Sequence, residues 1–255
     1  MSHLFIKTEG HGPPLVLLHG WGFSSEIWAP ILPVLTQHFQ VTLVDLPGHG
    51  QSMFLPQFNE IHEVAHYLVR HTPPNAIWVG WSLGGLIALA CAQQYPEHIK
   101  QLLQVASTPK FVTSEDWNYG VKPNIMTQFE QQLQANTQAT LTRFVTLQTL
   151  GLPNAKQDAR ELAIYIQEHL PSRAGLYWGL HILRTLDLRP LLASIQCPIH
   201  YLLGAKDSLV PLALKDYLTQ NYPHIGVEVL PTAAHMPFFS HPALFLQWLN
   251  HATHS

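Results

Sequence analysis

Short apolar runs recur along the first hundred residues, and each one ends at a turn residue. Three such runs are residues 15–18 (LVLL), 41–44 (VTLV) and 76–79 (AIWV). Glycine follows the first and third runs within two residues, and a Pro-Gly pair follows the second. Short runs that are rich in β-branched residues and end at Gly or Pro predict strands buried on both faces, as in a parallel sheet.

Helical patterns fill the intervals between these runs. Val64, Ala65 and Leu68 fall on one face at helical spacing, and a second helix is expected to begin just after Ser82. Strands and helices that alternate in series predict an α/β protein. We expect a mostly parallel central sheet with helices on both of its faces.

The alternation stops at about residue 110. Four amphipathic helical stretches follow one another without a convincing strand. Pro123 suits a first helical position, Thr137 and Ser172 are expected N-caps, and Gly151 is an expected helix terminator. This pattern predicts an all-helical insertion.

Strand-like runs return near the C-terminus, at residues 199–203 and 227–230, and a last helix is expected at about 243–250. We therefore predict one α/β core made of residues 1–109 and 190–255, with a helical cap inserted at 110–189. The cap is the relatively cationic part of the chain.

Composition narrows the class of function. Of the 255 residues, 47% are hydrophobic and 11% are charged, and the formal net charge is −3. These values argue against disorder, and the charge balance gives no reason to expect a nucleic-acid partner. Cys91 and Cys197 cannot form a disulfide framework or a zinc site, and nothing suggests a metal or another cofactor. With no signal peptide or membrane-spanning run visible, we expect a cytoplasmic monomer.

The strongest chemical signal is the run GWSLGG at residues 80–85. It matches the G-x-S-x-G pattern and lies between a predicted strand and a predicted helix, which is the context that this motif requires. Small residues allow a turn so sharp that the Ser82 hydroxyl projects above the sheet, at the positive end of the following helix. The sequence therefore predicts that Ser82 is a nucleophile.

A serine hydroxyl needs a base to take its proton and an acid to orient that base. In hydrolases of this architecture the chain order is Ser, then Asp or Glu, then His. Asp207 follows the predicted strand at 199–203, and His235 follows the one at 227–230. Among the competing residues, Asp187 lies in the insertion, Asp216 lies inside a predicted helix, and His241 is the second choice of base.

Attack on an ester carbonyl creates an oxyanion, which requires two positioned N–H donors. One is expected from the backbone of Leu83, directly after the nucleophile. The other is expected from the loop after the first predicted strand, where Trp21 is the favoured donor. We also expect the Trp21 side chain to form a wall of the substrate pocket.

Taken together, these residues resemble the α/β-hydrolase family over essentially the whole chain. The runs LLHGWG (17–22), VDLPGHG (44–50), WVGWSLGG (78–85) and LQTLG (147–151) are more closely similar to the pimeloyl-[acyl-carrier protein] methyl ester esterases of biotin synthesis. The runs QDAR (157–160) and AAH (233–235) are similar as well. Several of these runs lie in the cap and in the histidine loop, where hydrolases of this fold normally diverge.

This resemblance implies hydrolysis of the methyl ester at the far end of a pimeloyl chain carried by an acyl-carrier protein. It also implies an acyl channel lined by residues 144–148 of the cap, which are Phe144, Val145, Thr146, Leu147 and Gln148. Trp21, Leu83, Phe144 and Leu147 have the apolar side chains that a methylene chain requires.

Carrier proteins are acidic, so a basic patch is expected to dock the carrier. Lys156 and Arg160 share a helical face and could form such a patch with Arg143. The sequence departs from the family at Gln138 and Ala139, where a further basic residue is expected.

Three alternatives stay open from the sequence. The first is a general short-chain carboxylesterase with the same mechanism. The second is another reaction of the same fold, such as that of a C–C bond hydrolase, a peroxidase or an acyltransferase. The third is a non-catalytic binding or sensor protein, which would not need Ser82, Asp207 and His235. Dehalogenases and epoxide hydrolases of this fold need an acid in place of Ser82 and are excluded.

Overall fold

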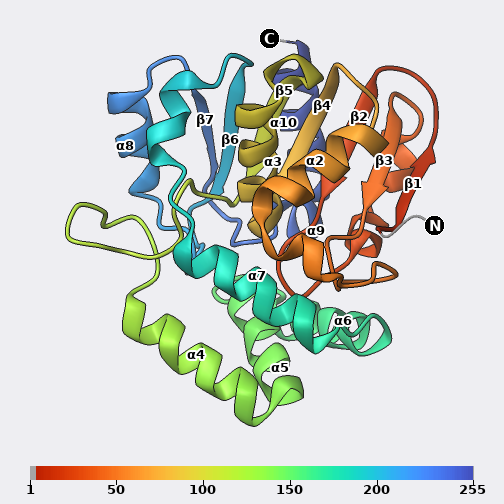
Figure 1. Cartoon of the computed structure of the whole chain (residues 1–255). Helices are drawn as coiled ribbons and strands as arrows, with labels where there is room; N and C mark the ends of the chain where they lie inside the picture. Colours follow the sequence, from red (N-terminus) through yellow and green to blue (C-terminus); the bar gives the residue numbers. More distant parts are fainter. Residues whose placement is uncertain (1–3, 255) are drawn as a thin grey trace.

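The central sheet has the mostly parallel arrangement that the apolar runs predict (Figure 1). A computed structural model describes residues 4–254 and orders seven strands as β1-β3-β2-β4-β5-β6-β7. Every neighbouring pair is parallel except β1 and β3. The strands are β1 (Ile6–Glu9), β2 (Pro14–Leu18), β3 (Gln40–Val44), β4 (Ala76–Trp81), β5 (Ile99–Val105), β6 (Ile199–Gly204) and β7 (Gly226–Leu230).

Two of these strands, β1 and β5, are not among those predicted from the sequence. β1 is an antiparallel edge strand with polar residues at three of its four positions. β5 lies inside the sheet but carries Lys100, Gln101 and Gln104. Gln101 is accommodated because its Nε2 donates to the carbonyl of Ala252, 2.6 Å away. The polar residues of β1 and β5 therefore hide these strands from a search for apolar runs.

Helices cover both faces of the sheet (Figure 1). Helices α2 and α3 lie side by side on one face, and α10 lies on the other. The predicted face of α2, including Val64, Ala65 and Leu68, is buried, and so is nearly all of α3. The helices of the core are α1 (Leu32–Leu35), α2 (Ile61–His71), α3 (Leu83–Gln94), α8 (Leu214–Asn221), α9 (Pro237–Ser240) and α10 (Pro242–His254). The predicted α/β architecture is confirmed.

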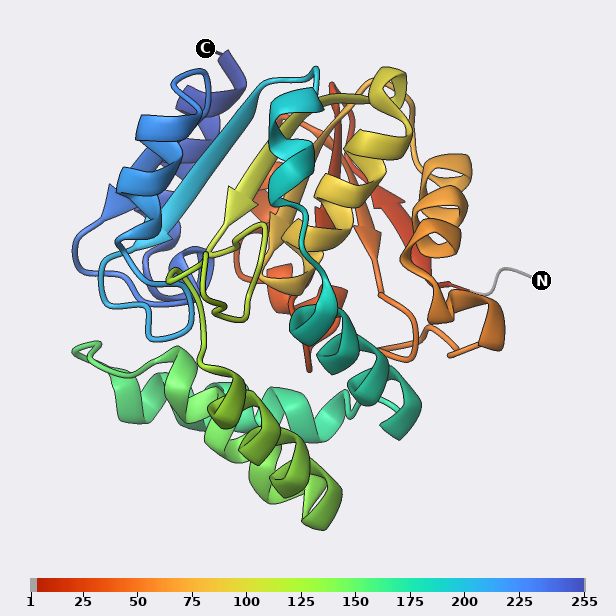
Figure 2. The same ribbon diagram turned by 60° about the vertical axis from the view of Figure 1, so that its left-hand side comes forward.

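Four further helices form a layer beyond the carboxyl ends of the strands (Figure 2). They are α4 (Pro123–Ala135), α5 (Thr137–Gln148), α6 (Ala155–Glu168) and α7 (Arg173–Thr185). Residues 106–122, which precede them, contain no helix and are closed by isolated bridges between Val112 and Val121 and between Ser114 and Trp117. The predicted cap limits at residues 110 and 189 stay a prediction.

The helix signals in this layer are mostly as expected. Pro123 is the first residue of α4, and the Ser172 hydroxyl caps α7 by accepting from the backbone N–H of Gly175. The expected cap at Thr137 is wrong by one residue. The side-chain oxygen of Asn136 accepts from the N–H of Ala139, while the Thr137 hydroxyl donates back to the carbonyl of Leu133. Both residue types favour this position, and only the backbone geometry decides between them.

Helix α7 touches the core where two glycines meet. The backbone N–H of Ser172 donates to the carbonyl of Gly48 over 2.8 Å. A Cβ atom on Gly175 would come within 2.7 Å of the Gly48 backbone, so no larger residue fits at this contact without a shift. The missing side chain allows α7 to lie directly against the loop that follows β3.

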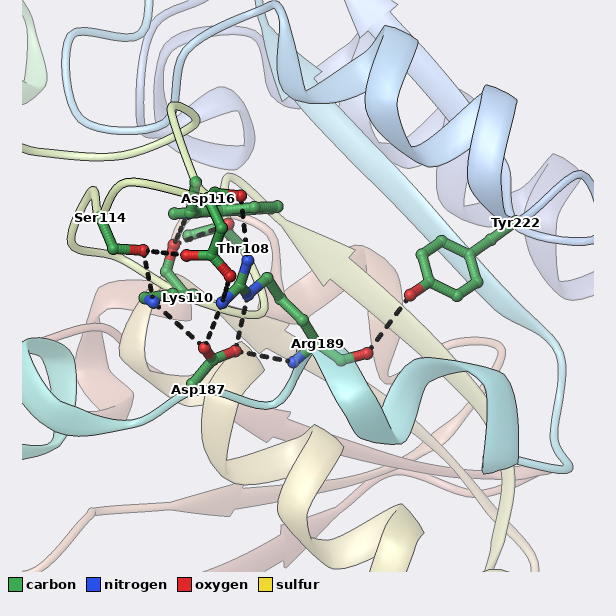
Figure 3. A network of polar contacts seen from close by, with 8 residues as sticks. Thr108, Lys110, Ser114, Asp116, Asp187, Arg189 and Tyr222 are labelled. Atoms are coloured by element: carbon green, nitrogen blue, oxygen red, sulfur yellow. Dashed lines mark hydrogen bonds and ion pairs between the residues drawn. The ribbon is translucent and has the colours of Figure 1, made fainter.

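A polar network fastens together the segments that leave and re-enter the core (Figure 3). Arg189 donates to both carboxylate oxygens of Asp187, at 2.8 and 2.6 Å, and to Asp116 Oδ2 at 3.0 Å. Lys110 Nζ lies 3.1 Å from Asp187 Oδ2, and the Arg189 guanidinium lies 5.1 Å from the centre of the Trp117 ring. The hydrogen bonds from Arg189 are the main reason that the pKa of Asp187 falls to about 2.

We expect Arg189→Gln to lower the free energy of unfolding by about 1–3 kcal/mol, because the change leaves the half-buried Asp187 without its bidentate partner. Urea unfolding followed by circular dichroism measures the loss. The control is Arg184→Gln, which removes a more exposed pair with Glu130 and is expected to cost about 0–1 kcal/mol. Equal losses in the two variants would contradict a special role for the network.

Candidate active site

Ser82 occupies the turn between β4 and α3. Its φ angle of 53° lies in the left-handed region, which a residue with a side chain adopts only under constraint. A Cβ atom on Gly80 would come within 2.5 Å of the Cα of Gly85, so the turn can be this tight only with glycine there. The backbone N–H of Ser82 donates to Val105 of the neighbouring strand, and its carbonyl accepts from Ser107. These contacts fix the direction of the serine side chain.

The three side chains that the sequence singles out lie within hydrogen-bond distance of one another. His235 Nε2 lies 3.0 Å from Ser82 Oγ, and His235 Nδ1 lies 2.7 Å from Asp207 Oδ2. The other oxygen of Asp207 accepts from the backbone N–H groups of Leu209 and Val210. Because Asp207 can only accept when ionised, its bond assigns the imidazole proton to Nδ1 and leaves Nε2 to accept from the serine.

Burial and packing hold this arrangement in place. Only 4% of Ser82 and 1% of His235 is exposed. The indole N–H of Trp81, the residue before the serine, donates to the backbone carbonyl of His235 over 2.8 Å. Trp81, which is next to Ser82, therefore holds the loop that carries His235 through a direct hydrogen bond.

In the described residues 4–254, two backbone amides of interest lack a protein acceptor, that of Leu83 directly after Ser82 and that of Trp21 in the loop after β2. Leu83 is the first residue of α3, where N–H groups lack partners within the helix and the helix dipole is positive. The predicted pair of donors is thus available, and its role stays a prediction.

The loop that carries Trp21, residues 19–25, is fixed to the core by buried polar side chains. His19 Nδ1 donates to the Gly20 carbonyl at 2.8 Å, and its Nε2 accepts from the N–H of Leu46. His49 Nε2 accepts from the N–H of Gly22, and Asp45 Oδ1 accepts from that of Ser25 at 2.7 Å. None of these residues was a predicted site residue. His19 and Asp45 each follow a predicted strand directly, and that position is the signal that could have identified them.

Burial keeps the side chains of His19 and His49 in their neutral form in the folded protein. Complete burial lowers the pKa of His19 to about 4. Burial, reinforced by the neighbouring His19, lowers the pKa of His49 to about 3. In this state each ring can accept the backbone hydrogen bond that a protonated ring could not.

An apolar pocket opens onto Ser82. Of the residues in the described part of the chain that line it, Ser82 alone has a side chain that is neither apolar nor aromatic. The predicted wall residue Trp21 is present, and its ring makes an edge contact with Phe144 at 4.9 Å between ring centres. The lining is Trp21, Ser82, Phe111, Val121, Ile125, Met126, Phe129, Phe144, Leu147, Leu180, Leu183 and Leu209.

Only part of the predicted acyl channel lines this pocket. Phe144 and Leu147 face it, whereas Val145 lies in a groove between α5 and α6, and Thr146 is exposed. Gln148 is buried, and its side-chain amide has no hydrogen-bond partner among the described residues. Residues at consecutive positions of a helix point in different directions, so one run of five cannot face one cavity. Leu83 is buried against the helix layer near Gly179 and is not a lining residue.

Most of the pocket comes from cap residues that the sequence analysis did not single out. Ile125, Met126 and Phe129 come from α4, and Leu180 and Leu183 come from α7. Their helical spacing of three or four residues was visible, but such spacing does not distinguish a substrate-facing stripe from a core-facing one.

The remaining sequence candidates lie apart from the serine. Asp187 belongs to the network around Arg189, Asp216 lies on α8, and His241 follows α9, where Ser240 contacts its ring nitrogen. The basic residues expected to bind a carrier are all exposed, with Arg143 on α5 and Lys156 and Arg160 on α6.

The geometry can support acyl transfer. It provides a constrained hydroxyl, an imidazole that can accept the hydroxyl proton, a carboxylate behind the imidazole, and backbone amides at Leu83 and Trp21 that have no protein acceptor among the described residues. A family described as having the alpha/beta hydrolase fold matches residues 13–242. The chain belongs to the α/β-hydrolase family.

This α/β hydrolase also has relatives that match nearly its whole length. It is 43% identical over 250 residues to the pimeloyl-[acyl-carrier protein] methyl ester esterase of Pectobacterium atrosepticum, covering 97% of each chain. It is 42% identical over 249 residues to the protein of the same name from Yersinia enterocolitica, covering 97% of this chain and 96% of the relative.

Solved structures of this hydrolase fold are similar over nearly the whole molecule. An esterase from Exiguobacterium antarcticum superimposes with a TM-score of 0.89 at 20% identity, covering 99% of this chain and 96% of that one. A bromoperoxidase from Bacillus anthracis superimposes with a TM-score of 0.90 at 21% identity, covering 99% and 95%. At this identity the likeness establishes the fold of this α/β hydrolase and nothing more specific.

Proposed function

We propose that this protein is a serine esterase that hydrolyses the methyl ester of pimeloyl-[acyl-carrier protein], releasing methanol and the free pimeloyl-carrier acid. The observation that carries the proposal is the 43% identity over 97% of both chains with an esterase of that name. The apolar pocket that ends at Ser82 supports it, because the substrate offers a methylene chain with an ester at its end.

The residues divide the reaction in the following way. His235 takes the proton from Ser82 as Oγ attacks the ester carbonyl, while Asp207 stabilises the imidazolium that forms. The N–H groups of Trp21 and Leu83 bind the oxyanion. His235 then protonates the departing methanol, leaving the acyl group bonded to Ser82. Water, activated by the same histidine, hydrolyses this acyl-enzyme and restores the serine.

The pocket also gives the bound chain a direction. Ile125 and Leu147 line the pocket and are nevertheless 48% and 40% exposed, so they mark its mouth on the cap. With the ester at Ser82, the thioester end of the chain leaves through this mouth. Arg143 lies one helical turn before Leu147 on α5, close to where the carrier would sit.

The test compares two substrates at matched concentration. We expect kcat/KM for pimeloyl-carrier methyl ester to exceed that for a free short-chain ester such as p-nitrophenyl butyrate, with methanol and free acid formed in equal amounts. A protein that hydrolyses only the free ester would be a general carboxylesterase. Hydrolysis of neither ester would overturn the assignment as an esterase.

A second test addresses the carrier. We expect the triple variant Arg143→Gln, Lys156→Gln, Arg160→Gln to lower kcat/KM for the carrier-bound ester by about tenfold through KM, because exposed charges act mainly on encounter. Its rate on the free ester should not change. The matched control neutralises Arg70, Lys100 and Lys215, which are exposed on the core. Equal effects on the two substrates, or equal effects of the two triple variants, would contradict docking at the cap.

Two further expectations accompany this proposal, the cytoplasmic location and the monomeric state. No helix within residues 4–254 has the length and apolar character needed to cross a bilayer.

Gln138 and Ala139, where a further basic residue is expected for carrier docking, lie at the start of α5. Docking would therefore rest on the three remaining basic side chains.

A further inference from the structure

The hydroxyl of Tyr165 joins cap helix α6 to the loop that carries Trp21. Tyr165 Oη lies 2.6 Å from Ser24 Oγ, and it donates to the backbone carbonyl of the same serine over 3.2 Å. Because the tyrosine proton is used for the carbonyl, the serine hydroxyl is the donor in the shorter bond. The hydroxyl groups of Tyr165 and Ser24 therefore both have hydrogen-bond partners within this contact.

The ring of Tyr165 continues this contact toward His235. It lies 5.8 Å from the ring of Phe23, and Phe23 in turn lies 5.1 Å from the ring of Trp81. The indole of Trp81 donates to the backbone of His235. A Cβ atom on Gly20 would come within 2.9 Å of the Trp81 ring, so this ring also packs directly against the peptide that carries the Trp21 N–H.

Loop 19–25 is thus held from two sides. On the core side, His19 accepts from the N–H of Leu46, His49 accepts from the N–H of Gly22, and Asp45 accepts from that of Ser25. The cap adds two contacts: Tyr165 bonds to Ser24, and the carbonyl of Leu176 accepts from the indole N–H of Trp21 at 2.8 Å. The position of the Trp21 backbone therefore depends in part on how the cap lies on the core.

Tyr165 itself is not part of the pocket. Among the described residues, those that line the pocket above Ser82 do not include Tyr165, so we expect no direct contact between its side chain and a chain bound there. Burial raises the pKa of its hydroxyl, and the proton therefore stays in place throughout the pH range of an esterase assay.

We infer that Tyr165 is a positioning residue for ester hydrolysis, which acts through Ser24 to hold the Trp21 amide where the oxyanion forms. This inference rests on the proposed function and names a second component of the same site. The oxyanion hole then depends on the packing of α6 against the core as well as on the core itself. A cap that lifts away from loop 19–25 releases the loop on that side.

The test is Tyr165→Phe, which removes both bonds to Ser24 and keeps the ring that packs on Phe23. Loss of one oxyanion donor costs about 10²–10³ in kcat, and a displaced donor costs less, so we expect kcat on a free short-chain ester to fall about 10- to 100-fold. KM should change by less than about twofold, because the pocket is not altered. The matched control is Tyr177→Phe on α7, whose hydroxyl has no partner in the described part of the chain.

A second variant separates positioning from folding. Ser24→Ala removes the hydroxyl partner of Tyr165 and leaves the backbone carbonyl in place. The double variant with Tyr165→Phe should lose little more kcat than Tyr165→Phe alone, because the hydroxyl–hydroxyl bond is already lost in Tyr165→Phe. Melting temperatures should stay within a few degrees of the parent. Wild-type kcat in Tyr165→Phe, additive losses in the double variant, or a loss shared by Tyr177→Phe would overturn the inference. Absence of ester hydrolysis in the parent protein would instead overturn the proposed function.

Discussion

Ser82→Ala and His235→Ala should each lower kcat for ester hydrolysis by about 10⁴- to 10⁶-fold, and the double variant should lose little more. The two residues act together, because His235 Nε2, 3.0 Å from Ser82 Oγ, takes the proton of the attacking hydroxyl. Without either residue this proton transfer is lost. Steady-state rates on a free ester measure the losses. Melting temperatures of the variants check that they remain folded.

The carboxylate behind the imidazole has its own matched pair of variants. Asp207→Asn should lower kcat by about 10⁴-fold, because an amide can donate to Nδ1 and thus favours the wrong tautomer. Asp216→Asn, on the surface helix α8, is the control and should leave kcat unchanged. Losses that multiply independently across Ser82, Asp207 and His235 would argue against a cooperative set.

The second large effect concerns stability in acid. In the unfolded chain His19 and His49 titrate near pH 6.5, whereas burial lowers their pKa in the folded protein to about 4 and about 3. Between these values the unfolded chain binds more protons, so folded-state stability is complete above pH 6.5 and is lost as pH falls toward 4. The loss from His19 alone is on the order of 3 kcal/mol.

Urea unfolding at pH 7.5, 6 and 5 measures this dependence. The variant His49→Gln removes one titrating group, and its amide oxygen can still accept from the N–H of Gly22. We expect its stability to depend less steeply on pH than that of the parent. The same slope in parent and variant would show that the acid sensitivity arises elsewhere.

Chain order and strand ends were sufficient to predict which side chains would meet. Ser82, Asp207 and His235 are separated by more than a hundred residues in total, yet each follows an apolar run that becomes a parallel strand. The carboxyl ends of parallel strands share one edge of the sheet, so residues that follow them converge there.

The shape of the pocket could not be predicted in the same way. Phe111 and Val121 come from residues 106–122, whose fold depends on isolated bridges and on the distant Arg189. Within α5, the direction of each side chain depends on how the helix is rotated, which separates Phe144 and Leu147 from Gln148. Such features are set by tertiary packing, and local sequence carries little information about them.

The contact between Gly48 and Gly175 has a consequence for how this enzyme can diversify. The contact between these two glycines places α7 directly against the core, with no side chain between them. Helices α4 and α5 supply five of the residues that line the pocket. Substitutions on α4 and α5 can therefore change the shape of the pocket and the range of substrates. The catalytic residues keep their arrangement, because α7 stays packed on the core.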